Sequence, residues 1–351
     1  MDLTLCGATA FAYWRTPPQL LGMYPPLSHP FEDSNHLKFA QSPLICDVLS
    51  TPLHRVVTSQ NQRRTSKLYV SHYIKAFPFG SFCDTDHGFT VTSPAATLLT
   101  MAQSCSREVL LMAAYEMTGP FAVFTPCKRA EETLEQNPGQ RVAVGSVPWR
   151  RVQNVDGCGT DLWQRRPLLS LGELTSFCKS ADGFRGIQKL RWAAEHVTGE
   201  TASPFEVQAS MLLGLSKTSG GEGYYVQNNV RIPLSPAARR IYPHNACYAD
   251  ILIEGQADNA GVIVECQGKS VHATEAASIL DSDRTTALTS MGYEVILLTY
   301  EQIKDAKSFQ VVCDLIARKA GAKRHPKTAR ALQAQENLRK TLFDDWSLLG
   351  R

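Results

Sequence analysis

Residues 262–272 read VIVECQGKSVH, and this stretch decides the fold of the second half of the chain. The apolar run at 262–264 is typical of a strand that is buried on both faces. The run ends in charge, because Glu265 follows directly and Cys266 and Gln267 come next. A charged carboxylate at the end of a buried strand is unfavourable unless it has a partner. The neighbouring sequence offers a candidate for the group that it faces.

A second strand-like run, CYADILIE at 247–254, precedes the first across a turn-rich segment, so the two runs predict an antiparallel hairpin. If this hairpin is centred on Ala257 and Asp258, Asp250 lies directly opposite Glu265. Directly opposed residues have Cβ atoms about 4.5 to 5.5 Å apart, and like charges so placed destabilise a sheet. A cation between the two carboxylates would remove the repulsion.

We therefore expect a Mg²⁺ or Mn²⁺ site whose ligands come from Asp250, Glu265 and Cys266. Carboxylate oxygens and a backbone carbonyl are ligands that Mg²⁺ binds at about 2.1 Å, together with several waters. The alternative is that both carboxylates are solvated charges that discourage edge pairing. A register slip of one residue would also send Asp250 to the other side of the sheet.

The elements around the hairpin follow the order helix, hairpin, helix, strand. The first helix lies in TASPFEVQASMLLGL at 201–215, where Ser203 and Glu206 stand in capping-box order. The second helix is expected at 274–291, and the strand EVILLTY follows at 294–300. Glu206 has two interpretations, because a glutamate at this position can cap the helix or belong to an acidic site.

This succession resembles the very-short-patch-repair-like branch of the PD-(D/E)XK nucleases. The resemblance covers about residues 200–305 and rests on SPFEVQ, YADILIE, VECQGKSVH, DSDR and LTSMGYEVILLTYEQI. It implies an α/β, restriction-endonuclease-like core in which a mixed sheet is flanked by helices. It also implies that Asp250 and Glu265 are metal ligands, that Glu206 is an accessory acidic residue, and that the substrate is DNA.

Gln267 stands where the family motif has a lysine. A glutamine cannot supply positive charge to a transition state, so it could only orient the attacking water or a ligand. His272, or less directly Lys269, is then the candidate for part of the lysine's role. Three functions follow: a metal-dependent DNA endonuclease, a non-catalytic DNA-binding regulator of the antitoxin type that retains the nuclease fold, or an interaction module with solvated carboxylates.

The chain of 351 residues is long enough for about two domains. We expect an α+β domain at 1–165 and the endonuclease-like domain, with a basic helical tail, at 166–351. The first part is rich in proline and aromatic residues, and strands are predicted in LHRVVTS and KLYVSHYI. It resembles the middle domain of AbiE-type antitoxins in ATAFAYWRTPP, LHRVV and FTVTSPAATLLTMAQ, which implies a protein partner.

The composition also bears on the class of protein, through its charge, its apolar stretches and its cysteines. A net charge of +3 does not by itself indicate a nucleic-acid binder, and no apolar stretch is typical of a signal peptide or a membrane span, so we expect a cytoplasmic protein. The ten cysteines are scattered without metal-ligand spacing, which favours reduced thiols. The basic stretch 318–340 is either a solvated helix face or a contact with phosphates, and a smaller basic cluster comprises Arg63, Arg64 and Lys67.

Overall fold

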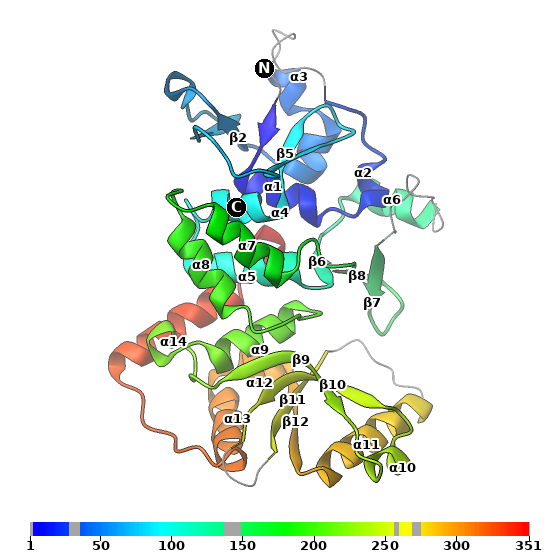
Figure 1. The fold of residues 1–351 in the computed structure, drawn as a ribbon. Coiled ribbons are helices and arrows are strands. Elements are labelled where there is room, and N and C mark those ends of the chain that lie inside the picture. The colour runs from blue at the N-terminus through cyan, green and yellow to red at the C-terminus, as the bar shows by residue number, and fades with distance from the viewer. Residues whose placement is uncertain (1–2, 28–35, 137–148, 256–259, 269–274, 351) are drawn as a thin grey trace. The chain divides into compact units, whose positions relative to one another are not determined.

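The computed structural model describes residues 3–27, 36–136, 149–255, 260–268 and 275–350 (Figure 1). The chain divides into two compact units. The first comprises residues 1–152, 160–197 and 347–351, and the second comprises residues 153–159 and 198–346.

This division differs from the boundary that we expected after residue 165. The turn residues that indicated a boundary, in NVDGCGTDL, form the tip between strands β7 (Arg150–Gln153) and β8 (Gly159–Gln164). Helices α7 (Leu171–Ser180) and α8 (Ile187–His196) come after that tip and still belong to the first unit. The cluster of turn residues therefore marks a hairpin tip, which is itself grouped with the second unit, and the main border follows Val197.

The first unit contains a five-stranded sheet in the order β3-β2-β1-β5-β4. Its strands are β1 (Thr4–Leu5), β2 (Leu53–Val57), β3 (Tyr69–Tyr73), β4 (Phe82–Asp84) and β5 (Thr90–Thr92). The predicted strands in LHRVVTS and KLYVSHYI are confirmed as β2 and β3. The other elements are α1 (Gly7–Arg15), α2 (Pro18–Leu21), α3 (His36–Ala40), α4 (Pro94–Met101), α5 (Arg107–Thr118), β6 (Phe121–Val123) and α6 (Lys128–Gln136).

A buried ion pair holds the helical part of this unit together. Arg15 of α1 contacts Glu116 of α5 at 2.7 Å, and both side chains are almost completely buried. The same carboxylate accepts a hydrogen bond of 3.1 Å from the backbone N–H of Val123 at the end of β6. Because the carboxylate is satisfied by two elements at once, it fixes α1 and β6 against α5.

The second unit is built on a four-stranded mixed sheet in the order β12-β11-β10-β9 (Figure 1). Strands β9, β10 and β11 are antiparallel neighbours, whereas β12 runs parallel to β11. The bounds are α9 (Pro204–Gly214), β9 (Val226–Pro233), α10 (Ala238–Ile241), β10 (Ala246–Ile253), β11 (Gly261–Gln267), α11 (Glu275–Ser290), β12 (Tyr293–Thr299), α12 (Tyr300–Lys304), α13 (Ala306–Lys319) and α14 (Ala329–Leu342).

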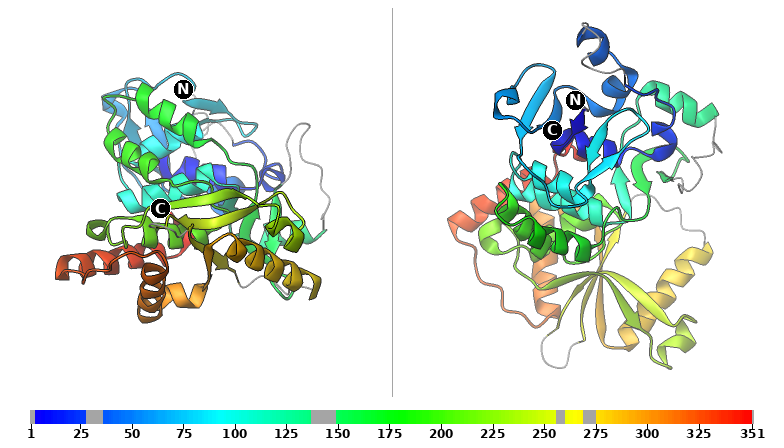
Figure 2. Two further views of the ribbon diagram at one scale, coloured as in Figure 1. Left: turned by 60° about the horizontal axis from the view of Figure 1, so that its bottom comes forward. Right: turned by 45° about the horizontal axis from the view of Figure 1, so that its top comes forward.

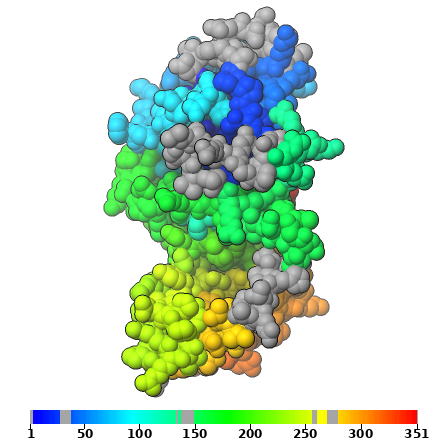
Figure 3. Space-filling model, turned by 90° about the vertical axis from the view of Figure 1, so that its right-hand side faces the viewer, coloured from blue at the N-terminus to red at the C-terminus, as the bar shows by residue number. Residues whose placement is uncertain are grey.

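Helices cover both faces of this sheet. Helix α11 lies on one face and α9 and α13 lie on the other, as the two further views show (Figure 2). Ala287 and Leu288 of α11 pack in one apolar cluster with Ile263 of β11. The space-filling view shows residues of the β9 to β10 region, in lime, beside those of α11, in yellow to amber (Figure 3). The predicted α/β class and the predicted element order are confirmed, and β9 is an addition.

The register between β10 and β11 is the one that the hairpin pattern predicts. The described ladder pairs Ile251 with Val264, and continuing it by one step places Asp250 opposite Glu265. The turn residues Ala257 and Asp258 lie outside the described residues. The position of the two carboxylates therefore follows from the ladder and not from the turn.

The side-chain alternation of β10 breaks at Asp250. Ala249 and Leu252 both belong to the cluster that packs on α11, although regular alternation would place them on opposite faces of the sheet. In β9, Asn229 has a φ of +51°, in the left-handed region where asparagine is enriched among non-glycine residues. The pairing of β9 with β10 is regular on both sides of this position, so the irregularity is confined to the candidate site.

The basic C-terminal stretch is part of the packing of the second unit. Glu222, in the glycine-rich loop after α9, accepts hydrogen bonds of 2.6 Å from Lys327 and 3.0 Å from Arg324. Lys319 pairs with Glu294 of β12, and Lys340 pairs with Glu336. Burial opposes the ionisation of Glu222, but the bonds and charges of Lys327 and Arg324 outweigh it and lower its pKa. Several of these cations are thus committed within the fold.

Two observations concern the whole described chain. None of the helices among the described residues is long and apolar enough to cross a membrane. All ten cysteines lie within the described residues, and each is a free thiol.

Replacing Lys327 with methionine should destabilise the second unit by about 2 kcal/mol or more, because it removes one of two cations from a buried carboxylate. The side chains of Glu222 and Lys327 are 1% and 6% exposed. The matched control is Lys340→Met, which breaks an exposed pair on one helix and should cost less than about 0.5 kcal/mol. Urea unfolding measures both changes. Equal losses in the two variants would contradict the structural role of Glu222.

Candidate active site at the β10 and β11 strands

Asp250 and Glu265 lie side by side across the β10–β11 ladder and differ in their partners. The carboxylate Oδ2 of Asp250 accepts a hydrogen bond of 2.8 Å from the backbone N–H of Cys266. No described residue donates to its Oδ1. Glu265 is buried at the end of the apolar run of β11. The structure therefore brings together the two carboxylates that the sequence predicts to be opposed.

Arg284 supplies positive charge at this site, and the sequence analysis did not assign it a role. It lies on α11, and its two terminal nitrogens contact the two oxygens of Glu265 at 3.1 and 2.9 Å. One of these nitrogens also donates to the carbonyl of Tyr248 on β10. This guanidinium thus joins α11 to both strands, and a bidentate pair of this kind is geometrically specific.

Glu206 caps helix α9. Its backbone N–H donates to the hydroxyl of Ser203 at 3.3 Å, and its own carboxylate accepts from that hydroxyl at 2.9 Å. The reciprocal backbone bond comes from Ala202, at 2.7 Å, and not from the N-cap residue itself. The capping interpretation is confirmed. It does not displace the other interpretation, because each carboxylate oxygen retains capacity for a second interaction.

Asn228 of β9 is a second residue that the sequence analysis missed. Its amide Nδ2 donates to the carbonyl of Asp250 at 3.0 Å and to the hydroxyl of Ser210 on α9 at 2.7 Å. The Ser210 hydroxyl in turn donates to the carbonyl of Glu206 at 2.7 Å. Thr198 donates to the Asn228 Oδ1 at 2.5 Å. One buried amide therefore ties the backbone of Glu206 to the backbone of Asp250.

The charge of Asp250 acts on both neighbouring glutamates. Burial and the nearby charge of Asp250 raise the pKa of Glu265 to about 7, although Arg284 opposes the shift. Burial, with a further contribution from Asp250, raises the pKa of Glu206 to about 7. Burial also raises the pKa of Asp250, while the Cys266 N–H and Arg284 lower it. A shared field of this kind is found at functional sites and also in structural ion-pair networks.

The other predicted site residues have separate outcomes. Burial raises the pKa of the Cys266 thiol, and the charges of the three neighbouring carboxyl groups add to the shift. The thiol is therefore a poor metal ligand, because a thiolate is needed for binding. Only the backbone carbonyl of Cys266 remains a candidate ligand. Gln267 is exposed at the end of β11, two residues beyond Glu265. His272 and Lys269 lie outside the described residues.

The donor set fits a hard cation such as Mg²⁺ in kind, because it consists of carboxylate and carbonyl oxygens. Oδ1 of Asp250 accepts from no residue that the structure describes, whereas both oxygens of Glu265 already accept from Arg284. Among the described residues, no group of three or more His, Cys, Asp or Glu side chains is arranged to hold a metal ion. A cation would accordingly bind through Asp250 and the remaining lone pairs of Glu265.

Comparison of the chain with protein-family models, with curated proteins and with solved structures found no match.

Glu206→Gln should change how stability depends on pH. The pKa of Glu206 is about 7 in the folded protein and about 4.3 in an unfolded chain. The folded state therefore binds more protons within that window, and the free energy of unfolding falls as pH rises through it. The glutamine variant keeps an acceptor for Ala202 but does not titrate. Between pH 5 and pH 8 the free energy of unfolding should fall by about 1 to 3 kcal/mol less in this variant than in the wild type.

The matched control is Glu173→Gln, in the exposed capping box of α7. Hydrogen bonds from Ser170 lower the pKa of Glu173, so its stabilising effect is present throughout pH 5 to 8. Its substitution should leave the pH dependence in this range unchanged. Urea unfolding at both pH values measures the effect. A Glu206→Gln profile that runs parallel to the wild type would show that Glu206 is not held in a buried, charge-coupled site.

Proposed function

We propose that the second unit is a metal-dependent endonuclease that hydrolyses phosphodiester bonds in DNA. The observation that carries the proposal is the β10–β11 register, which sets Asp250 opposite Glu265 at a point that Asn228 of β9 links to Ser210 of α9. Directly opposed carboxylates destabilise a sheet, and here one is buried and the other partly buried, so their presence favours a function. The same residues carry the resemblance to the PD-(D/E)XK nucleases.

The order of elements supports a restriction-endonuclease-like core. A helix, α9, precedes three antiparallel strands, and a second helix, α11, leads into a fourth strand that is parallel to the third. The PD-(D/E)XK resemblance implies a mixed sheet of this kind with flanking helices. Strand β9, which the sequence pattern did not reveal, brings Asn228 to the back of Asp250. The core is therefore more complete than the predicted hairpin.

The residues of the site have distinct roles in this proposal. Asp250 and Glu265, with the backbone of Cys266, would hold a divalent cation. Such a cation would lower the pKa of a bound water and offset charge on the phosphoryl oxygens. Arg284 opposes the rise in the pKa of Glu265 and fixes the orientation of its carboxylate. Gln267 positions the attacking water through its amide group. Glu206 holds the start of α9 and adds negative charge beside Asp250.

A second candidate is a non-catalytic, DNA-binding regulator that retains this fold. The observation that favours it is the Arg284–Glu265 pair, which neutralises one of the two carboxylates without a metal ion. Gln267 in place of the motif lysine points in the same direction. The two candidates differ in one measurable property, which is cleavage of DNA in the presence of Mg²⁺.

Glu265→Gln should reduce the cleavage of supercoiled plasmid in Mg²⁺ by about a hundredfold or more, because it removes charge that holds the cation. The control is Glu336→Gln, which makes the same chemical change at an exposed pair on α14 and should cleave like the wild type. Circular dichroism verifies that both variants fold. Cleavage by Glu265→Gln at the rate of the wild type would contradict the proposed site.

Gln267→Lys should raise the cleavage rate in Mg²⁺ by about tenfold or more, because it places a cation beside the attacking water and the scissile phosphate. The substrates are duplex, single-stranded and mismatched DNA. A wild type and a Gln267→Lys variant that are equally inactive on all three would favour the regulator.

A further inference from the structure

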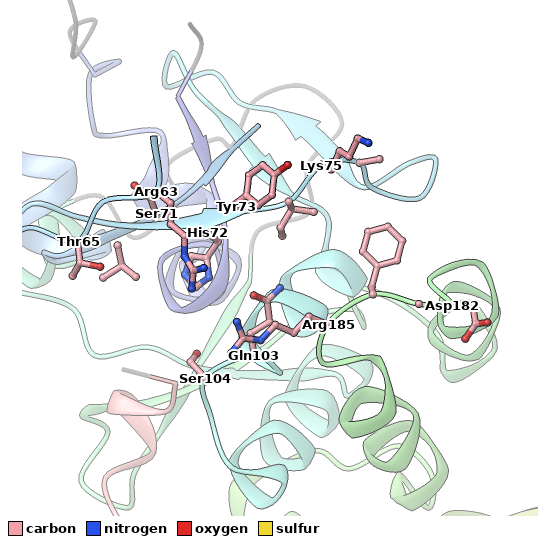
Figure 4. A pocket seen from close by; sticks show the side chains of 15 residues that line it. Arg63, Thr65, Ser71, His72, Tyr73, Lys75, Gln103, Ser104, Asp182 and Arg185 are labelled. Carbon is pink, nitrogen blue, oxygen red and sulfur yellow. The ribbon is translucent and has the colours of Figure 1, made fainter. Parts of the chain in front are cut away.

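The first unit contains a cavity of about 590 Å³ that the function proposed above does not use. It lies between the edge strand β3, the turn that joins α4 to α5 and the turn that joins α7 to α8 (Figure 4). A volume of this size is within the usual range of about 300 to 1,000 Å³ for small-molecule sites. All residues that line the cavity belong to the first unit.

Three cationic side chains line this cavity. Arg63 comes from the segment before β3, Lys75 from the segment after it, and Arg185 from the α7–α8 turn. None of the three makes an ion pair with a described residue. Figure 4 shows Arg63 beside His72 and Arg185 beside Gln103, whereas Lys75 lies at the far end of the strand. The carboxylate in the lining, Asp182, is already paired with Arg191 at 2.9 Å.

The charges of Arg63 and Arg185 both act on His72. Burial, the neighbouring His54 and, to a smaller extent, the charges of Arg63 and Arg185 together lower the pKa of His72 to about 4, and its bond to Gln103 opposes the shift. The rings of His72 and His54 are joined by a hydrogen bond of 3.1 Å. The two guanidinium groups near His72 bring positive charge to this end of the cavity, and no carboxylate in the described lining forms an ion pair with either.

Glycine at position 186 fixes one of these arginines in place. Gly186 has a φ of +91°, and a Cβ there would lie 3.0 Å from the Cβ of Ala102 at the end of α4. Only glycine permits this close approach of the α7–α8 turn without strain. The neighbouring Arg185 is thereby set beside Gln103, so the cavity is a consequence of the packing of the first unit.

The lining also offers neutral donors and aromatic surface. Thr65, Gln103 and Ser104 carry hydroxyl or amide donors, which suit phosphate oxygens. Tyr73, which is 38% exposed, and Phe184 contribute aromatic surface. Arginine is well suited to phosphate because its fork binds two oxygens at once, and an aromatic ring is a suitable surface for a nucleobase. Phosphate recognition and base stacking can therefore occur in one cavity.

We propose that this cavity binds a nucleoside phosphate, with the phosphate group on Arg63 and Arg185 and the base against the aromatic side chains. The same chemistry is present in a free nucleotide and in the 5′-phosphorylated end of a DNA strand. The proposal does not rest on the nuclease function of the second unit.

Calorimetric titration of the full chain tests the proposal with four probes: dTMP, thymidine, 5′-phosphorylated tetrathymidylate and its unphosphorylated form. We expect dTMP to bind and thymidine not to bind. Arg63→Gln and Arg185→Gln should each weaken the binding of dTMP about tenfold or more, because each removes a charge-assisted hydrogen bond. Tighter binding of the phosphorylated tetranucleotide than of dTMP would identify a strand end as the ligand, and weaker binding would identify a free nucleotide.

The matched control is Arg166→Gln, which makes the same change at an exposed arginine of the first unit outside the cavity lining and should leave binding unchanged. Thermal unfolding verifies that all variants fold, and Arg63 and Arg185 are themselves exposed. Absence of dTMP binding, or binding that Arg63→Gln and Arg185→Gln leave intact, would overturn the proposal. A failure to detect DNA cleavage would not contradict nucleotide binding, because the cavity lies in the first unit and the proposed cleavage site lies in the second.

Discussion

The ion pair between Arg284 and Glu265 is the interaction on which the candidate site depends. The β10–β11 register places two carboxylates opposite each other beside a buried apolar run, and the guanidinium of Arg284 partly neutralises their charge while contacting both strands. The same contact joins α11 to the sheet. A single cation therefore contributes to the electrostatics of the site, to the pairing of the strands and to the position of the helix that covers them.

The buried amide of Asn228 complements that pair on the other side of Asp250. It replaces a regular ladder bond where β9 and β10 are irregular, and it fixes the start of α9 through Ser210. A rigid framework of this kind is what a functional site requires of the residues behind it. It explains how β10 can hold Asp250 in place although the side-chain alternation fails there.

The sequence predicted the parts of this site that obey local rules. The register follows from the symmetry of the hairpin, and the cap at Ser203 follows from its spacing to Glu206. Strand β9 was missed because Asn-Asn and a terminal proline favour turns over strands. The importance of Arg284 was missed because an arginine on a helix is usually solvated, and only the tertiary packing of α11 brings it to Glu265. For the basic stretch 318–340, the sequence left two alternatives, a solvated helix face and a contact with phosphates. It did not reveal the actual partner of Arg324 and Lys327, because nothing in the sequence indicates that the carboxylate of Glu222 is buried.

The most direct test of the account is a calorimetric titration of the full chain with Mn²⁺ at pH 8, where Glu206 and Glu265, each with a pKa of about 7, are mostly ionised. The account predicts saturable binding in the wild type that is lost in Asp250→Asn, because this substitution removes the charge of the carboxylate whose Oδ1 accepts from no described residue. Binding of equal strength in Asp250→Asn, or no binding in the wild type, would contradict a metal site between Asp250 and Glu265 and would leave Arg284 as the cation of the site.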